Sequence, residues 1–319
     1  MAGPDSVRRL KVADSKDTGS YLACIPHLYN LELLEIQMHC SAYCELSVSP
    51  FACLQRLQNL KVVGTANAGV SVAGLQQLPR LTALSLIDAY PSCIPLQVTN
   101  MCLTSVVPAP HRFLQPTAAL VMGFQGRLAE ASLDLSLFDN RAACLAQAAC
   151  LQGLLRLQLD ICNWTHCGSG WCTWFFSQLE VLQVSFRWTS SAPSSQAHIM
   201  YRPEWDLSCC LSLKELHFIM DSLAVDLRGI KHVTATTFRL DLPDVYTDPR
   251  LALACQSWSL KEAVVTRPGM PEGNIAWCVT DAVRALMRTR DGPPVLTVNG
   301  MSPVQHAMHA LWGKRSDWW

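Results

Sequence analysis

Hydrophobic residues along this chain recur in one short phrase, in which successive leucines are spaced three, three and then two residues apart. The clearest copy runs from Leu151 through Leu154 and Leu157 to Leu159, and apolar Ile161 follows it. Alternation at the end of the phrase is typical of a strand with one buried face, whereas steps of three are typical of a tight helical turn. Each copy therefore predicts a turn that leads into a short strand.

The phrase returns along most of the sequence. Leu157 and Leu182 occupy equivalent positions in neighbouring copies and lie about 25 residues apart, a spacing that indicates a repeat architecture. In such an array each unit buries its leucines against its neighbours, because no unit has a core of its own. The copies predict strands within residues 7–12, 34–36, 60–62, 84–86, 131–135, 154–161, 182–184, 213–218, 238–242, 260–265 and 295–298.

Two segments, residues 88–125 and 188–210, do not follow the pattern and are predicted to be irregular, with a degenerate strand at residues 103–106 within the first. Between the strands, stretches of small residues such as 70–75 predict helical or irregular returns. Favourable composition or apolar periodicity predicts helices at residues 141–151, 275–288 and 303–312. We expect a repeat array over residues 1–300 and a capping helix with a tail over 301–319. Prolines at positions 91, 95, 108, 110 and 116 are expected to interrupt any helix or central strand.

These units resemble the leucine-rich repeat family, whose phrase LxxLxLxxN/C recurs roughly every 20–29 residues. The resemblance covers residues 7–300 and implies an α/β solenoid, a curved horseshoe with parallel β-strands on the concave face and a helical or irregular convex face. The chain departs from the family at the asparagine or cysteine that closes the strand, since only Cys162 stands there in a well-matched unit. We therefore expect irregular turns. The blurred units are similar to the arrays attached to F-box proteins, although the N-terminal residues contain no F-box helical segment.

Composition narrows the functional classes. Half of the residues are hydrophobic and 16% are charged, so most of the chain is expected to fold. The formal net charge is zero, which provides no long-range field for nucleic acid or an anionic membrane. The sequence has 15 cysteines in no regular framework and starts without the apolar region of a secretory signal. These features favour reduced thiols and an intracellular location, cytoplasmic or nuclear, with a cytoskeletal or axonemal site as a further option.

The residues that alternate with the buried leucines are predicted to line the concave face. They carry both charge signs and several neutral polar groups, a mixture that suits a protein partner better than a phosphate backbone. We expect no cofactor at this face. The predicted partner-binding residues are Glu35, Gln37, Asn59, Lys61, Ser85, Arg156, Gln158, Asp160, Gln183, Ser185, Glu215 and His217.

Catalytic chemistry has little support in the sequence, and we predict a protein that is not an enzyme. No nucleophile, phosphate-binding or metalloprotease motif is present. The segment from Cys162 to Cys172 contains three cysteines and His166, but its spacing is not that of a usual zinc knuckle. A zinc-dependent enzyme is the alternative of another class. The predicted function is a protein-interaction scaffold, with the substrate-recognition part of an F-box-type ubiquitin ligase or a structural cytoskeletal component as narrower versions.

Overall fold

A computed structural model describes about half of the chain. The described ranges are 6–13, 22–39, 43–65, 70–105, 111–134, 149–162, 176–187, 205–220, 230–231, 233–241, 262–266 and 295–298. The chain divides into two compact units, Met1–Asp160 (unit 1) and Ile161–Trp319 (unit 2). Each unit is described by itself.

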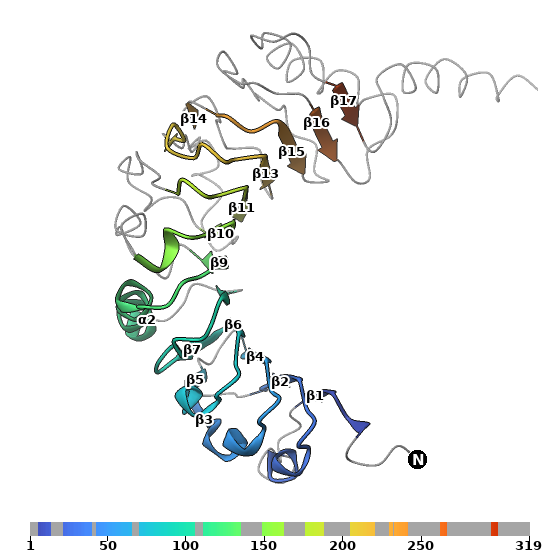
Figure 1. Ribbon diagram of the computed structural model, residues 1–319, viewed down its shortest axis with the longest axis vertical. Helices are drawn as coiled ribbons and strands as arrows, with labels where there is room; N and C mark the ends of the chain where they lie inside the picture. The colour runs from blue at the N-terminus through green and yellow to red at the C-terminus, as the bar shows by residue number, and fades with distance from the viewer. Residues whose placement is uncertain are drawn as a thin grey trace, which may run out of the picture. The chain divides into compact units, whose positions relative to one another are not determined.

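Unit 1 is built on a parallel sheet with the strand order β1-β2-β4-β6-β8-β9-β10 (Figure 1). Every neighbouring pair in this order is parallel and in register, so equivalent residues of successive repeats lie opposite one another. The strands are β1 (Arg9–Ala13), β2 (Leu33–Gln37), β4 (Asn59–Val63), β6 (Ala83–Ile87), β8 (Asn100–Thr104), β9 (Glu130–Asp134) and β10 (Arg156–Cys162).

The leucine phrase forms the core of unit 1. In β2, β4, β6, β8, β9 and β10 the second and fourth residues are buried, as in the Leu34–Leu60–Leu84 row, whose members are at most 1% exposed. A neighbouring row of branched residues, which includes Ile36 and Val62, is fully buried as well. Burying each such side chain contributes roughly 1.5–3 kcal/mol to the free energy of folding. These two rows therefore hold the successive repeats of unit 1 together. The alternation predicted from the sequence is confirmed for these strands.

Tight turns lead into the strands at the edge where the strands begin, which we call the amino edge. At this edge, one backbone carbonyl of each repeat accepts two amide hydrogens from the next repeat. For example, the Gln58 carbonyl oxygen lies 2.9 Å from the amide nitrogens of both Thr82 and Ala83. The same arrangement repeats along the edge, which fixes equivalent positions in successive turns. Before several of these turns lie short 3-10 helices, η2 (Ile25–His27), η3 (Ser49–Cys53), η4 (Leu75–Gln77) and η6 (Ala149–Leu151).

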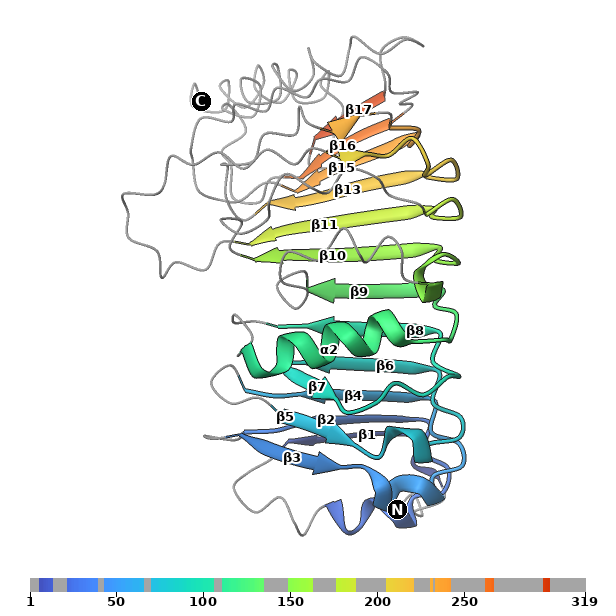
Figure 2. The same ribbon diagram turned by 90° about the vertical axis from the view of Figure 1, so that its left-hand side faces the viewer.

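The return segments of unit 1 contain a second, smaller parallel sheet in the order β3-β5-β7. Its strands are β3 (Cys44–Ser47), β5 (Val70–Ala73) and β7 (Ala89–Pro91), and they lie on the opposite side of the core from the larger sheet (Figures 1 and 2). The expectation that residues 70–75 form a helical or irregular return is wrong. Val70 and Val72 alternate with less buried residues, and this period of two indicates a strand.

Gly74 shows how closely the returns pack. Its φ of +85° is a left-handed conformation that side chains other than glycine rarely adopt, and a Cβ added there would meet the Ser49 amide nitrogen at 2.9 Å. Glycine at this position therefore allows β5 to end against the preceding return and η4 to begin. The spacing of the two returns depends on this absence of a side chain.

The segment 88–125 is more regular than its prolines suggested, and the prediction of an irregular segment is wrong where the structure describes it. It contains β7, β8 and the helix α2 (His111–Gly123), with Pro116 inside the helix. Proline removes one helical hydrogen bond, at a cost of about 3 kcal/mol in a helix interior. Burial of Thr117, Ala118 and Val121 after the proline offsets this cost and holds α2 in the same layer as the smaller sheet (Figure 2).

Unit 2 repeats the plan with a parallel sheet in the order β11-β13-β15-β16-β17. The strands are β11 (Val181–Arg187), β13 (Glu215–Met220), β15 (Thr237–Asp241), β16 (Glu262–Thr266) and β17 (Val295–Val298), and a separate pair joins β12 (Trp205–Asp206) to β14 (Ile230–Lys231). Its core contains a row of aromatic rings. Phe218 lies 6.0 Å from Phe186 and 5.9 Å from Phe238 between ring centroids, and all three are fully buried.

Several predicted elements lie outside the described residues. They are most of the helix predicted at 141–151, the helices at 275–288 and 303–312, the cap at 301–319, and the irregular segment 188–210 apart from its last residues. These remain predictions. What the structure does show is the coarser fold class, an α/β-like chain dominated by parallel strands with few helices.

Candidate functional site

The candidate site of unit 1 is the solvent side of its larger sheet, which we call the polar face. It consists of the first and third residues of these strands and of the fifth residues of β1, β2, β4, β6 and β8, whereas the fifth residues of β9 and β10, Asp134 and Asp160, are buried. Strand register aligns these residues into three rows that run across the sheet. The middle row reads Lys11, Glu35, Lys61, Ser85, Cys102, Ser132 and Gln158.

Most residues predicted to bind a partner lie on these rows. Glu35, Lys61, Ser85 and Gln158 share the middle row of unit 1, and Gln183 faces His217 in the middle row of unit 2. The remaining members flank them on the outer rows: Gln37, Asn59, Arg156 and Glu215. Each of these side chains is at least partly exposed. The structure thus brings the predicted residues of each unit onto one surface; whether that surface binds a partner stays a prediction.

Charges on the polar face pair across strands. The Glu35 carboxylate lies 3.0 Å from the Lys11 amine and 3.4 Å from the Lys61 amine. The hydrogen bond from Lys11 lowers the pKa of Glu35 most, with Lys61 adding its charge, while partial burial opposes both. Glu35 is therefore held in its ionised form between two cations. This carboxylate is an organised feature of the face rather than a freely rotating surface group.

A second charged group lies farther along the sheet, where Glu130 joins two neighbours. Asn100 donates a hydrogen bond to Glu130 at 2.8 Å, and Arg156 approaches the same carboxylate at 3.8 Å. Between the two charged groups the middle row holds only the short side chains of Ser85, Cys102 and Ser132. The face of unit 1 thus has charged ends and a short-chained centre.

In unit 2 the face carries two cross-strand pairs. Arg239 lies 2.9 Å from Glu215, and the His217 Nε2 atom lies 2.8 Å from a carboxylate oxygen of Asp241. Glu215 and His217, which are two apart on one strand, therefore each face a residue of β15 rather than each other. Both pairs are half-exposed and lie on an open strand surface. They fix the positions of these four side chains on the surface.

Two predicted site residues are not on the exposed face, and their prediction as exposed residues is wrong. Asp160 and Ser185 are each 2% exposed. Successive strand residues point to opposite faces, yet Leu159, Asp160 and Ile161 are all buried, as are Val184 and Phe186 on either side of Ser185. Both faces of these strands are therefore covered at their carboxyl ends. A pattern read from leucines alone assumes that the face stays open along the whole strand.

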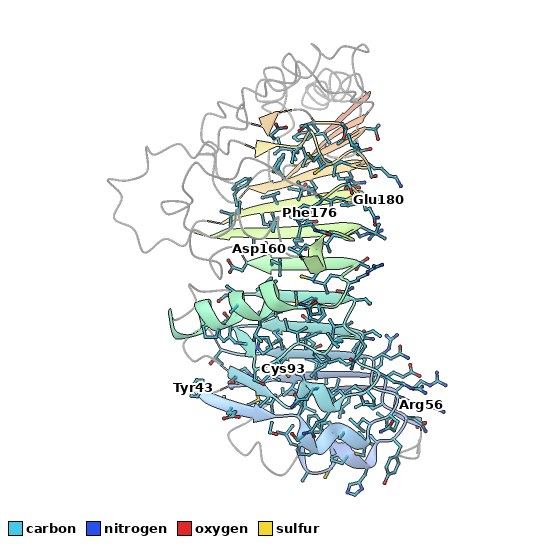
Figure 3. The ribbon with its side chains drawn as sticks, turned by 60° about the vertical axis from the view of Figure 1, so that its left-hand side comes forward. Tyr43, Arg56, Cys93, Asp160, Phe176 and Glu180 are labelled. Carbon is cyan, nitrogen blue, oxygen red and sulfur yellow. The ribbon has the colours of Figure 1, made fainter. Side chains whose placement is uncertain are left out.

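A row of buried polar residues at the carboxyl ends of the strands in unit 1 was not predicted from the sequence. Asp88, Ser105, Asp134 and Asp160 are at most 5% exposed. The Ser105 hydroxyl donates to the Asp88 carboxylate at 2.6 Å, and the Ser105 amide donates to Asp134 at 3.3 Å. We call this group, together with Tyr90, the buried polar row (Figure 3 labels Asp160). It supplies hydrogen bonds at the strand ends, where the expected closing asparagine is missing.

Geometry explains why this row tolerates aspartate. Asp88 has a positive φ of 50°, a conformation that aspartate adopts more readily than most residues. A Cβ at Gly64 would collide with the Asp88 carbonyl oxygen, so glycine leaves room for the turn. Burial, together with the charges of Asp88 and Asp134, raises the pKa of Tyr90 to about 12, and a hydrogen bond with Ser105 opposes this shift. Tyr90 therefore stays neutral at physiological pH.

Metal or catalytic chemistry finds no support in the described part of the chain. No three histidine, cysteine or acidic side chains there lie close enough together to hold a metal ion. The zinc hypothesis falls on residues 163–172, which are outside the described residues, and of its ligands only the strand position of Cys162 is known. Burial raises the pKa of the Cys150 and Cys210 thiols to about 11, which disfavours their nucleophilic thiolate forms.

Comparison with known proteins gives no relationship. No family model matches the chain, and no curated protein matches it significantly. Among the residues that the structure describes, no helix combines the length and apolar character needed to cross a membrane.

Proposed function

We propose that this chain is a leucine-rich-repeat-like solenoid that recognises a protein partner through its polar face. The supporting observation is the register of the parallel strands, which aligns partly exposed side chains of successive repeats into continuous rows. A surface built from many short strands presents side chains at fixed spacings of about 4.8 Å. Such a surface can match an extended area of another folded protein.

The chemistry of the rows favours a protein over other ligands. Charged groups of both signs stand at the ends of the face in unit 1, and neutral short side chains lie between them. Protein interfaces combine polar rims with less polar centres, whereas a nucleic acid requires clustered cations. The cation–anion pairs around Glu35 and Glu130 fix side chains before binding, which reduces the entropy lost on association.

Affinity capture with a matched pair of variants tests this proposal. One variant carries Lys61→Glu, Ser85→Glu and Gln158→Glu on the polar face. The control carries Gln76→Glu, Gln77→Glu and Ser92→Glu, three changes at partly or fully exposed positions of the return segments. We expect at least one protein to be retained by the wild type and the control and lost with the face variant, as measured by quantitative mass spectrometry.

The identity of that protein then separates the narrower versions. A cullin–adaptor complex supports a role in substrate recognition for a ubiquitin ligase, and a filament or axonemal component supports a structural role. If every captured protein is retained equally by both variants, the polar face is not the binding surface and the proposal fails.

A further inference from the structure

The amino edge of unit 1 carries a set of exposed arginines at equivalent positions. In successive turns, the carbonyl groups of Gln58, Thr82 and Ala129 each accept two backbone amide hydrogens from the following turn. Arg56, Arg80 and Arg127 each lie two residues before one of these carbonyls and are therefore equivalent. All three arginines are exposed. Figure 3 shows Arg56 at this edge, where the strands begin. Repetition of one residue type at one structural position makes an ordered row and not a random scatter.

The carboxylates of this edge are already engaged with other arginines. Glu32 lies 3.4 Å from Arg8, and Glu130 lies 3.8 Å from Arg156. Within the described residues, none of Arg56, Arg80 and Arg127 has a carboxylate within ion-pair distance. Desolvated, bidentate pairing with a carboxylate is the interaction that a guanidinium makes best. Because no described carboxylate pairs with them, these three groups are available to an external anion.

The other acidic side chains that the structure describes in this unit are paired elsewhere or lie apart from the row: Glu35 is held between Lys11 and Lys61, and Glu45 lies on the smaller sheet. Asp88, Asp134 and Asp160 are buried at the carboxyl ends of the strands, about 16 Å away along five-residue strands. Electrostatic screening at physiological salt acts over about 8 Å. The zero formal charge of the whole chain therefore conceals a cationic edge in unit 1.

An apolar side chain lies within this cationic row. Leu96 is 66% exposed and belongs to the turn before β8, which stands between β6 and β9 in the sheet. The turns of Arg80 and Arg127 therefore flank it. At the position equivalent to the arginines, this turn has Gln97, whose side-chain amide donates to the Leu78 carbonyl oxygen at 2.7 Å. The edge thus presents cations on both sides of one exposed leucine.

We propose that the amino edge of unit 1 binds an acidic segment of a protein, with carboxylates on Arg56, Arg80 and Arg127 and an apolar side chain on Leu96. Three strand spacings separate Arg56 from Arg127, about 14 Å, which matches about four residues of an extended peptide. The single apolar contact between the cations favours a peptide over a nucleic acid, whose bases would require aromatic platforms. The proposal rests on the proposed function in so far as the ligand is a protein.

Fluorescence anisotropy with labelled peptides tests this binding on the full chain. The probe is the peptide Asp-Glu-Asp-Leu-Asp-Glu-Asp, and its uncharged counterpart is Asn-Gln-Asn-Leu-Asn-Gln-Asn. We expect the acidic peptide to bind and the uncharged peptide to bind at least about tenfold more weakly. Raising the salt from about 50 to about 500 mM should weaken the acidic complex, since salt screens exposed charges.

Matched variants assign the binding to the edge. The edge variant carries Arg56→Gln, Arg80→Gln and Arg127→Gln, and the control carries Lys11→Gln, Lys214→Gln and Arg239→Gln, which remove the same charge elsewhere. We expect about a tenfold or greater loss of affinity in the edge variant and less than about twofold in the control. Leu96→Ser should weaken the acidic peptide and leave binding of an otherwise identical peptide with serine at its centre unchanged. Equal losses in both charge variants overturn the proposal.

Two further outcomes keep this inference separate from the proposed function. If a single-stranded oligonucleotide of equal charge binds through the same arginines more tightly than the peptide, the edge is a nucleic-acid site and the acidic-segment proposal is wrong. If the peptide does not bind, while Lys61→Glu, Ser85→Glu and Gln158→Glu together still abolish partner capture, the polar face retains its role and only the edge proposal fails.

Discussion

The amino edges of the two units differ although the same leucine phrase builds both. In unit 1 the exposed edge carries Arg56, Arg80 and Arg127, none of which has an ion-pair partner among the described residues. In unit 2 the structure describes the turns before β11, β13 and β15, which carry neutral residues at the equivalent positions (Gln178, Ser212 and Thr234) and one close pair, in which Lys214 lies 2.7 Å from Glu180. The backbone bonding is the same at both edges. Their chemistry differs only at positions that the fold leaves exposed, which is where a repeat array can acquire function without a cost in stability.

The cores of the two units differ in a complementary way. Unit 1 has rows of aliphatic side chains and a buried polar row at the strand ends. Unit 2 has stacked phenylalanines, and Ser185 is its one buried polar residue among those described. In unit 1, Asp88, Asp134 and Asp160 are thus buried, whereas Arg56, Arg80 and Arg127 are exposed. Composition averaged over the whole chain conceals this difference.

The aromatic core of unit 2 should be the most sensitive to truncation. Phe218→Ala removes a fully buried ring that contacts Phe186 and Phe238, and we expect it to lower the free energy of unfolding by about 3–5 kcal/mol. Urea denaturation measures this loss. Leu211→Ala, at a residue that is 73% exposed, is the control and should change stability by less than about 0.5 kcal/mol. A loss below about 1 kcal/mol for Phe218→Ala would contradict the role of the aromatic row.

The buried polar row should make unit 1 sensitive to alkali. Tyr90 has a folded-state pKa of about 12 and an ordinary value of 10.0, so the unfolded chain loses this proton first. Its contribution is complete below pH 10 and is lost as the pH rises towards 12, by roughly 2 kcal/mol. Cys150 and Cys210, with raised pKa values of about 11, act in the same direction.

Tyr90→Phe isolates this effect from the thiols and other titrating groups. We expect the wild type to lose more stability than the variant between pH 9.5 and pH 11.5, as measured by urea denaturation at both values. Parallel losses in the two proteins would show that the phenol does not become buried on folding. The same comparison in a Phe218→Leu background tests whether unit 2 contributes to the alkaline response.

Ser105 should be the most important hydrogen-bond donor of the buried polar row. Its hydroxyl donates to Asp88 and its amide to Asp134, so Ser105→Ala removes one donor from a buried carboxylate and should destabilise the chain by about 1–3 kcal/mol. Ser85→Ala, on the polar face, is the matched control and should change stability by less than about 0.5 kcal/mol. Equal effects of the two serine substitutions in thermal denaturation would remove the distinction between row and face.

These contrasts show which parts of the structure the sequence could predict. Strand positions followed from the leucine spacing, because alternation with a period of two depends only on one buried face. β8 lies within the segment predicted to be irregular, and only a degenerate strand at residues 103–106 was predicted there, because prolines surround the alternating Met101 and Leu103. The smaller sheet was missed although Val70 and Val72 alternate in the same way. Its strands have only three or four residues, too few for a periodic signal.

The exposed and buried sides were harder to predict than the strands. Glu35, Lys61 and Gln158 lie on the face as predicted, whereas Asp160 and Ser185 are buried by structure on both sides of the strand ends. An aspartate looks exposed in a sequence because burying a charge is costly, and only a three-dimensional set of donors such as Ser105 reverses that expectation. The arginine row was also hidden, since turn residues about 25 positions apart are neighbours only after the register is known.

The smallest expected effect concerns the cation–anion pairs of the polar face. Lys11 and Lys61 lower the pKa of Glu35, so its contribution is complete above its ordinary pKa and is lost as the pH falls through the lower folded-state value. Glu35→Gln should therefore cost about 0.2–1 kcal/mol at pH 7 and nothing at pH 2, because exposed pairs are weak. Chemical denaturation at both pH values measures it, and Glu45→Gln, on the exposed side of β3, is the control. A loss that persists at pH 2 would mean that Glu35 stabilises the face by packing and not by charge, and the face would then differ less from the hydrophobic rows than its composition indicates.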